Sequence, residues 1–189
     1  MTERLGPVGE QLSPAGGQRA AVVERLAPRQ RRTWAGYAAA IWAGLFGLVS
    51  LYWALGGLFA IDTVGGRIEE LARARDPQAY LLGWGATAGK AAGVLLALAL
   101  VQHWGRIVPR VLLLIAGWAA TVLLIGYGGL TVGAEALVAL HVLHLSSGVD
   151  TYAFYWHLAL WDPYFLVWGI LFGLAVRQFQ AATRPDESP

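Results

Sequence analysis

Residues 33–61 read TWAGYAAAIWAGLFGLVSLYWALGGLFAI, and this run contains no charged residue. A helix that crosses a bilayer needs about 20 consecutive, mainly apolar residues. Residues 111–134, VLLLIAGWAATVLLIGYGGLTVGA, form a second uncharged run of sufficient length. The two runs predict an integral membrane protein whose spans are helices.

The composition of the whole chain agrees with this class. Of 189 residues, 57% are hydrophobic and only 14% are charged, whereas about a quarter of the residues in a soluble domain carry charge. The length fits one domain. A net charge of +2, without a basic patch, gives no reason to expect a nucleic-acid partner. We expect membrane lipid to surround the chain.

The pattern outside the two runs predicts four spans and three regions. The expected spans cover about residues 34–60, 77–103, 111–129 and 163–180. They form a transmembrane domain (32–180) between a flexible N-terminal tail (1–31) and a short C-terminal tail (181–189). A charged segment, GRIEELARAR, and the polar stretch between the last two spans predict short extra helices on the outer side. The predicted fold is an all-α integral membrane four-helix bundle.

Small residues and Asp-Pro pairs set the ends and contacts of these spans. Asp76-Pro77 and Asp162-Pro163 each resemble a helix start, because Asp is a favoured N-cap and Pro fits the first helical position. Glycines recur every four residues in two spans, at Gly85, Gly89 and Gly93 and again at Gly169 and Gly173. Such stripes let helices approach closely, and they suggest homo-oligomers as well as internal packing.

Arginine counts predict the orientation. With both termini inside, the inner segments hold the arginines at 4, 19, 25, 29, 31, 32, 106, 110, 177 and 184, and the outer segments hold those at 67, 73 and 75. This asymmetry follows the positive-inside rule, so we expect both termini to be cytoplasmic.

Residues 135–163, EALVALHVLHLSSGVDTYAFYWHLALWDP, hold three of the four histidines, three acids and no basic residue. Glu135 follows the glycine-rich end of the third expected span. It is a candidate general acid in an apolar site. The alternative is an acid that stabilises the N-terminus of a new helix.

His157 and Asp162 lie five residues apart inside an aromatic segment. Brought together at the mouth of a pocket, they would form an acid/base couple. The alternative interpretation has Asp162 as an N-cap and His157 as an interfacial residue.

Lys90 is the only lysine of the chain and lies near the middle of the second expected span. A charge at a helix centre costs roughly 2.5–3.5 kcal/mol on insertion scales, so it faces the bundle interior and needs a partner. A functional role would be an ion pair, an anion clamp for a substrate or a neutral base. A structural role would be an ion pair with Glu135 or Asp162, or a lysine that reaches a water-filled cavity.

His141 and His144 share a helical face because they are three residues apart. Glu135 does not lie on that face, and a metal site needs three or four ligands. We therefore predict hydrogen-bonded pocket or interface histidines, with His144 a second candidate proton partner, and we expect no metal or other cofactor.

Two short motifs carry a resemblance. The sequence YWALGG at 52–57 and the sequence LWDP at 160–163 resemble those of small four-span bacterial membrane proteins without an assigned function, over roughly residues 35–178. More loosely, the acids beside aromatics are similar to small membrane-embedded bacterial terpene cyclases. These resemblances imply the bacterial inner membrane and a protonation-started reaction of a prenyl chain.

The leading hypothesis is thus a membrane-embedded acid/base enzyme that cyclises a lipophilic, prenylated substrate. An ionised carboxyl cannot donate a proton, so the reaction requires a carboxylic acid kept neutral by apolar surroundings. Glu135 is the first candidate acid and Asp162 the second, with His157 or His144 as proton partner. The expected substrate-binding residues are Tyr52, Trp53, Lys90, Trp118, His141 and Trp156. The competing hypothesis is a non-catalytic membrane protein, either a structural subunit or a small-solute transporter.

Overall fold

The computed structural model describes residues 33–140, 142 and 150–183. The four long helices are α2 (Trp34–Ala54), α4 (Pro77–Ala99), α5 (Arg110–Ala139) and a continuous helix over Thr151–Ala182, which comprises α6 (Thr151–Trp156), the π-helical segment η3 (His157–Trp161) and α7 (Asp162–Ala182). Shorter elements are η1 (Ile61–Thr63), α3 (Gly66–Arg73) and η2 (His103–Ile107). The described residues contain no strand, which confirms the all-α fold class. His141, His144, the N-terminal tail and residues 184–189 of the C-terminal tail lie outside the described residues.

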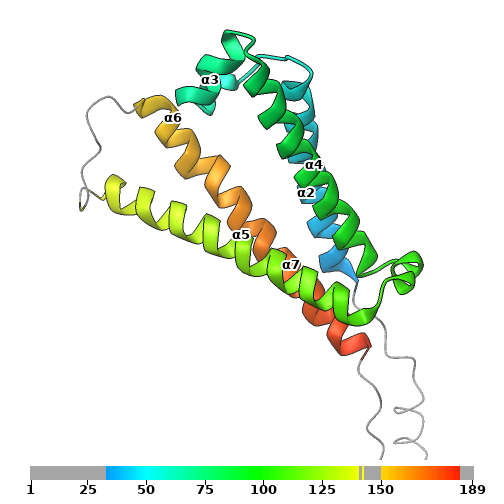
Figure 1. Ribbon diagram of the computed structural model, residues 1–189. Helices are drawn as coiled ribbons and strands as arrows, with labels where there is room; N and C mark the ends of the chain where they lie inside the picture. Colours follow the sequence, from blue (N-terminus) through cyan, green and yellow to red (C-terminus); the bar gives the residue numbers. More distant parts are fainter. Residues whose placement is uncertain (1–32, 141, 143–149, 184–189) are drawn as a thin grey trace, which may run out of the picture. The chain divides into compact units, whose positions relative to one another are not determined.

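The long helices alternate in direction and pack as two pairs (Figure 1). The most extensive contacts are those of α2 with α4 and of α5 with α7, and α2 packs against α7 to join the pairs. The start of α2, the end of α4, η2 and the start of α5 share one end with the end of α7. There, Arg110 Nε donates to Thr183 Oγ1 at 2.9 Å. The opposite end carries η1, α3 and α6.

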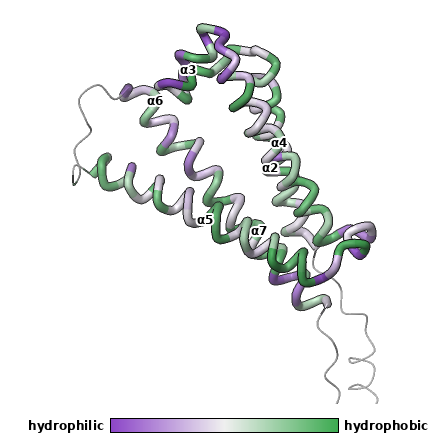
Figure 2. The backbone as a smooth tube through the Cα atoms, viewed as in Figure 1, coloured by the Kyte–Doolittle hydropathy of each residue, from purple (hydrophilic) through white to green (hydrophobic). Residues whose placement is uncertain are grey.

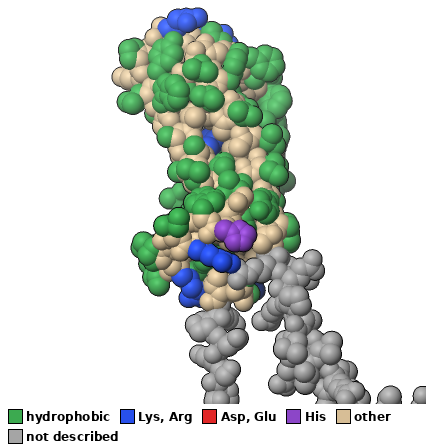
Figure 3. All heavy atoms as spheres, turned by 90° about the vertical axis from the view of Figure 1, so that its right-hand side faces the viewer, with side chains coloured by type: hydrophobic (Ala, Val, Ile, Leu, Met, Phe, Trp, Pro, Cys, Tyr) green, Lys and Arg blue, Asp and Glu red, His purple; other side chains and the backbone are tan. Residues whose placement is uncertain are grey.

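The distribution of side chains is that of a membrane protein. Alanines such as Ala35, Ala39 and Ala43 are buried between helices, while Leu81 and Leu130 are 75% and 78% exposed. Figure 2 shows hydrophobic residues along the long helices and hydrophilic ones near the ends. Figure 3 shows a hydrophobic belt on one face, with basic side chains at both ends and one small basic patch within the belt. All four long helices are long and apolar enough to cross a bilayer.

α5 does not end at its glycines. It continues through Gly126–Gly129 to Ala139, so Glu135 lies within the last turns of a helix and not at the start of a new one. In lipid an unbroken helix satisfies the backbone, and glycine gains from close packing. A Cβ on Gly128 would meet the backbone of Leu166 in α7. The interpretation of Glu135 as an N-terminal helix acid is therefore wrong.

The two Asp-Pro pairs differ in their role. Asp76 Oδ1 accepts from Gln78 N at 2.8 Å and caps α4, as predicted. Asp162 caps nothing, because the helix is already continuous when it reaches that residue. The N-cap interpretation of Asp162 is therefore wrong.

The glycine stripes are only partly used inside the described structure. Gly93 lies under the Trp168 ring, and Gly169 packs against α5 at Ile125. A Cβ on Gly85 or Gly89 would meet nothing within 4 Å. Homo-oligomerisation through that open stripe stays a prediction.

The YWALGG motif ends α2 and folds the chain back over it. Gly56 has φ +90, a conformation that favours glycine, and Gly57 N donates to Tyr52 O at 3.0 Å. Tyr52 and Trp53 then bind the next loop, because Phe59 N donates to the Tyr52 hydroxyl and Trp53 Nε1 donates to Phe59 O. This fold-back places η1 beside η3.

Candidate functional site

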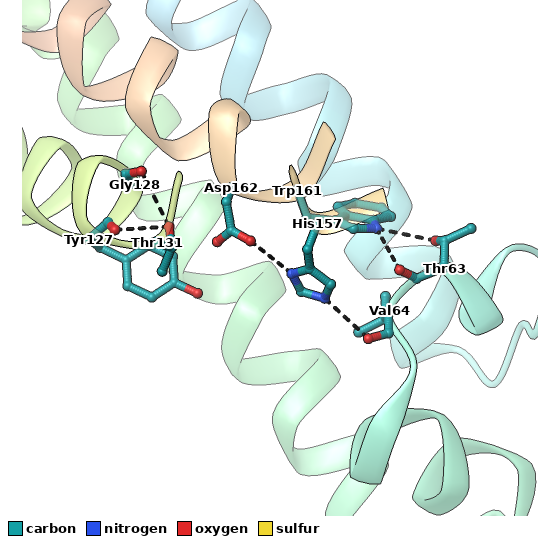
Figure 4. A network of polar contacts seen from close by, with 8 residues as sticks. All are labelled: Thr63, Val64, Tyr127, Gly128, Thr131, His157, Trp161 and Asp162. Atoms are coloured by element: carbon teal, nitrogen blue, oxygen red, sulfur yellow. Dashed lines mark hydrogen bonds and ion pairs between the residues drawn. The ribbon is translucent and has the colours of Figure 1, made fainter. Parts of the chain in front are cut away.

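His157 and Asp162 form a close pair inside the fourth long helix. His157 Nδ1 lies 2.9 Å from Asp162 Oδ2 (Figure 4). In a regular α-helix two residues five apart point roughly 140° away from each other, since each residue turns by about 100°. The π-helical segment His157–Trp161 widens the turn and brings positions i and i+5 onto one face.

Pro163 gives a physical reason for the π turn. Proline has no backbone N–H, and inside a helix its ring clashes with the carbonyl four residues earlier. The helix here passes through Asp162-Pro163 without ending, so the turn before the proline must open. The LWDP motif thus positions the acid and distorts the helix that presents the histidine.

The second ring nitrogen of His157 fixes the proton count of the pair. His157 Nε2 lies 3.1 Å from the carbonyl oxygen of Val64, which follows η1. A carbonyl only accepts, so Nε2 must carry a hydrogen. The contact between Nδ1 and Oδ2 needs another hydrogen, on the ring or on the carboxyl. The pair therefore shares one proton, either as imidazolium and carboxylate or as imidazole and carboxylic acid.

Glu135 on α5 completes a triad with this pair. Its carboxylate and the ligand atoms of His157 and Asp162 lie within 4.8 Å of one another. Glu135 Oε2 is buried and has no hydrogen-bond partner. Burying an unpartnered oxygen costs less in a neutral carboxylic acid than in a carboxylate. Figure 4 places Tyr127 and Thr131 of α5 on the side of Asp162 away from His157.

A second contact holds η1 against the π turn. Trp161 Nε1 lies 3.2 Å from both the carbonyl oxygen and Oγ1 of Thr63, and donates to them. The Trp161 ring lies 5.3 Å from the Trp53 ring, measured between centroids. The two sequence motifs therefore meet in space at this contact between tryptophan rings.

His157 lines a cavity of about 250 Å³ whose walls are mainly apolar. Aromatic rings supply much of the wall, from Phe46, Trp53, Trp161, Tyr164 and Phe165. The remaining lining comes from the end of α2, from η1, α3 and α4. Glu135 and Asp162 lie behind His157 and do not line it.

Lys90 lies in the same cavity wall. Its Nζ is 5.9 Å from the ring centroids of both Tyr164 and Phe165. It forms no ion pair within the described part of the chain, so neither Glu135 nor Asp162 neutralises it. The structural role as a partner of those acids is therefore wrong.

The structure separates the other predicted residues. Trp53 lines the cavity with His157, and it also borders a second, more open groove that Tyr52 and Trp156 line. Trp118 lines neither. Sequence reasoning missed Trp161 and Tyr164 as wall residues, although both lie within two residues of the quoted Asp-Pro pair. No sequence pattern could point to the Val64 carbonyl, because every residue has a backbone carbonyl.

The triad also offers the atoms for a metal ion. The Val64 carbonyl on the far nitrogen of His157 is the kind of partner that metal-binding histidines have. A tetrahedral zinc site with these three residues would need a fourth ligand. An ion would also displace the proton shared by His157 and Asp162. We interpret the triad as a proton site, and the absence of a cofactor stays a prediction.

Fold and site together define a helical membrane protein with a histidine–carboxylate triad beside an apolar cavity. The chain belongs to the DUF3995 family of proteins of unknown function, whose profile matches residues 42–172. The matched segment includes the triad, both motifs and Lys90. Comparisons with curated proteins and with solved structures gave no significant match.

Proposed function

We propose that this protein is a membrane-embedded acid/base enzyme that isomerises a lipophilic substrate, by cyclisation of a prenylated molecule started by protonation. The observation that supports this proposal is the geometry of His157 at the wall of an aromatic cavity, because its contacts with Asp162 and the Val64 carbonyl require a proton shared with Asp162. Acid/base chemistry needs a positioned group that both holds and releases a proton.

Within the triad, His157 is the group that exchanges the proton with the substrate, because it alone lines the cavity. Asp162 orients the ring and stabilises the imidazolium. Glu135, within 4.8 Å of both, holds a proton in reserve as a neutral acid. In this scheme neither acid donates its proton to the substrate directly, in contrast to the expectation from the sequence, and both act through His157.

An epoxide on the prenyl chain is the substrate group that suits this donor. An imidazolium protonates an oxygen lone pair far more readily than an alkene carbon. The epoxide oxygen would replace the Val64 carbonyl as acceptor of the Nε2 hydrogen. The C–O bond then breaks, a chain double bond forms the new C–C bond, and a carbon-bound proton returns to Nε2. One proton is gained and one is lost, so the product is an isomer.

The aromatic wall fits the cationic intermediate of that path. The faces of Trp53, Trp161 and Phe46 carry the negative side of their quadrupoles, which attracts a cation. A cavity of about 250 Å³ with few polar groups also excludes most water, which would otherwise capture the cation.

The test is turnover by purified protein in detergent. Farnesylated and geranylgeranylated acceptors, each as alkene and as terminal epoxide, are incubated with wild-type protein, His157→Gln and Asp162→Asn. We expect an isomeric product of unchanged mass from the epoxides, and a loss of about 10²- to 10⁴-fold in rate in both variants. Mass spectrometry with chromatography provides the readout.

Asp76→Asn is the matched control, because Asp76 also precedes a proline but only caps α4. It should keep the wild-type rate. No product from folded wild-type protein across the panel, or equal rates in Asp162→Asn and Asp76→Asn, would favour the structural-subunit or transporter hypothesis.

A further inference from the structure

One part of the cavity wall carries hydrogen-bond donors that lack an acceptor. Lys90 on α4 and Tyr164 on α7 both line it, with Lys90 Nζ over the Tyr164 ring. Tyr164 is only 2% exposed, and its hydroxyl has no hydrogen-bond partner. A buried hydroxyl without a partner is costly, and so is a half-buried ammonium without a counter-charge in an apolar wall.

A third donor lies one helical turn further along α7. Trp168 is 5% exposed, and its Nε1 also has no partner. The ring packs against Gly93, one turn after Lys90 on α4, where a Cβ would collide with it. Lys90 therefore contacts Tyr164 while Gly93 contacts Trp168, so α4 and α7 face each other here, and Trp168 lies next to the cavity without lining it.

These three groups offer donor hydrogens, and an ammonium and an indole N–H can only donate. What would satisfy them is an acceptor with negative charge. Lys90 lies near the middle of α4, a helix long and apolar enough to cross a bilayer. The charge must therefore arrive on a molecule whose remainder is apolar enough for the aromatic wall.

We propose that Lys90 and Tyr164 form an oxyanion-binding site that takes the carboxylate, or a similar singly charged oxyanion, of a small lipophilic acid. The ammonium pairs with the negative charge and the Tyr164 hydroxyl donates to one oxygen. The apolar part of the ligand lies along Phe46 and Phe165. The site binds its ligand whether or not the His157 triad performs chemistry.

Binding of radiolabelled decanoate to the full chain in zwitterionic lipid nanodiscs tests this site. Unlabelled decanoate and decanamide, which has the same size but no charge, serve as competitors. We expect decanoate to compete roughly tenfold to a hundredfold better than decanamide. Lys90→Met should abolish that preference, Lys90→Arg should keep part of it, and Tyr164→Phe should weaken decanoate binding several-fold.

One control variant shows whether the preference for decanoate belongs to this site. Arg106→Met, which removes an exposed cation in η2, should leave the preference intact. Decanoate binding is read without turnover, so a failed cyclase test does not decide this one. Nanodiscs with an anionic phospholipid distinguish the source, since Lys90-dependent competition by that lipid would assign the site to a lipid phosphate. Equal competition by decanoate and decanamide, or an unchanged preference in Lys90→Met, would overturn the proposal.

Discussion

At the scale of single residues, the backbone carbonyl of Val64 determines which ring nitrogen of His157 faces Asp162. Val64 O accepts from His157 Nε2, so the ring meets Asp162 through Nδ1 and must share a proton with it. Without the Val64 contact the ring could donate from Nδ1 and leave Nε2 without a hydrogen. The carbonyl thus acts as a positioning group for the acid/base pair.

The candidate residues could be predicted from the sequence because ionisable side chains are rare in this apolar chain. Glu135, His157 and Asp162 stand out in a stretch without Lys or Arg, and the structure brings these three together. The proton-sharing geometry was not predictable, because it depends on a π turn and on the carbonyl of residue 64, 93 positions away. Periodicity at about 3.6 residues per turn places His157 and Asp162 apart.

At the scale of elements, the contact between α5 and α7 sets the distance from Glu135 to the other two triad members. Gly128 lets the helices approach, because its missing side chain leaves room for the Leu166 backbone. Gly126 lies on the same helix but faces open space. The sequence marked both as part of one glycine-rich end, and only the packing distinguishes them.

Gly128→Ala should therefore destabilise the protein by about 1–3 kcal/mol, since the added methyl must displace backbone rather than a flexible side chain. Gly126→Ala is the matched control and should be neutral or stabilising by up to about 1 kcal/mol, because alanine favours the helix. Unfolding of both variants in detergent, followed by circular dichroism, measures the difference. Similar stabilities would contradict the assigned packing.

At the scale of the whole molecule, two helix pairs form the described domain, and the candidate site lies toward one end of it. The triad and the cavity lie toward η1, α3 and α6, while η2 and the end of α7 lie at the other end. The number and type of spanning helices followed from apolar length, which is a local property. The place where the cavity opens depends on how the pairs meet, and no local pattern encodes that.

The arginine distribution leads us to propose a bacterial inner-membrane protein with the η2 end in the cytoplasm. The chain has no cysteine, so single cysteines report accessibility cleanly. Glu70→Cys in α3 should react with a membrane-impermeant maleimide in intact spheroplasts, whereas Ile107→Cys in η2 should react only after lysis. Both side chains are exposed in the structure. The reverse labelling pattern would contradict the proposed orientation.

The proton shared by His157 and Asp162 is the central claim, and nitrogen NMR of ¹⁵N-histidine-labelled protein tests it without a substrate. The chain has only four histidines, so His157→Gln assigns the signal by its loss. We expect a protonated Nε2 and a strongly hydrogen-bonded Nδ1 in the wild type, with the Nδ1 signal shifting in Asp162→Asn and not in Asp76→Asn. A His157 signal typical of a solvent-exposed imidazole, unchanged in Asp162→Asn, would contradict the claim.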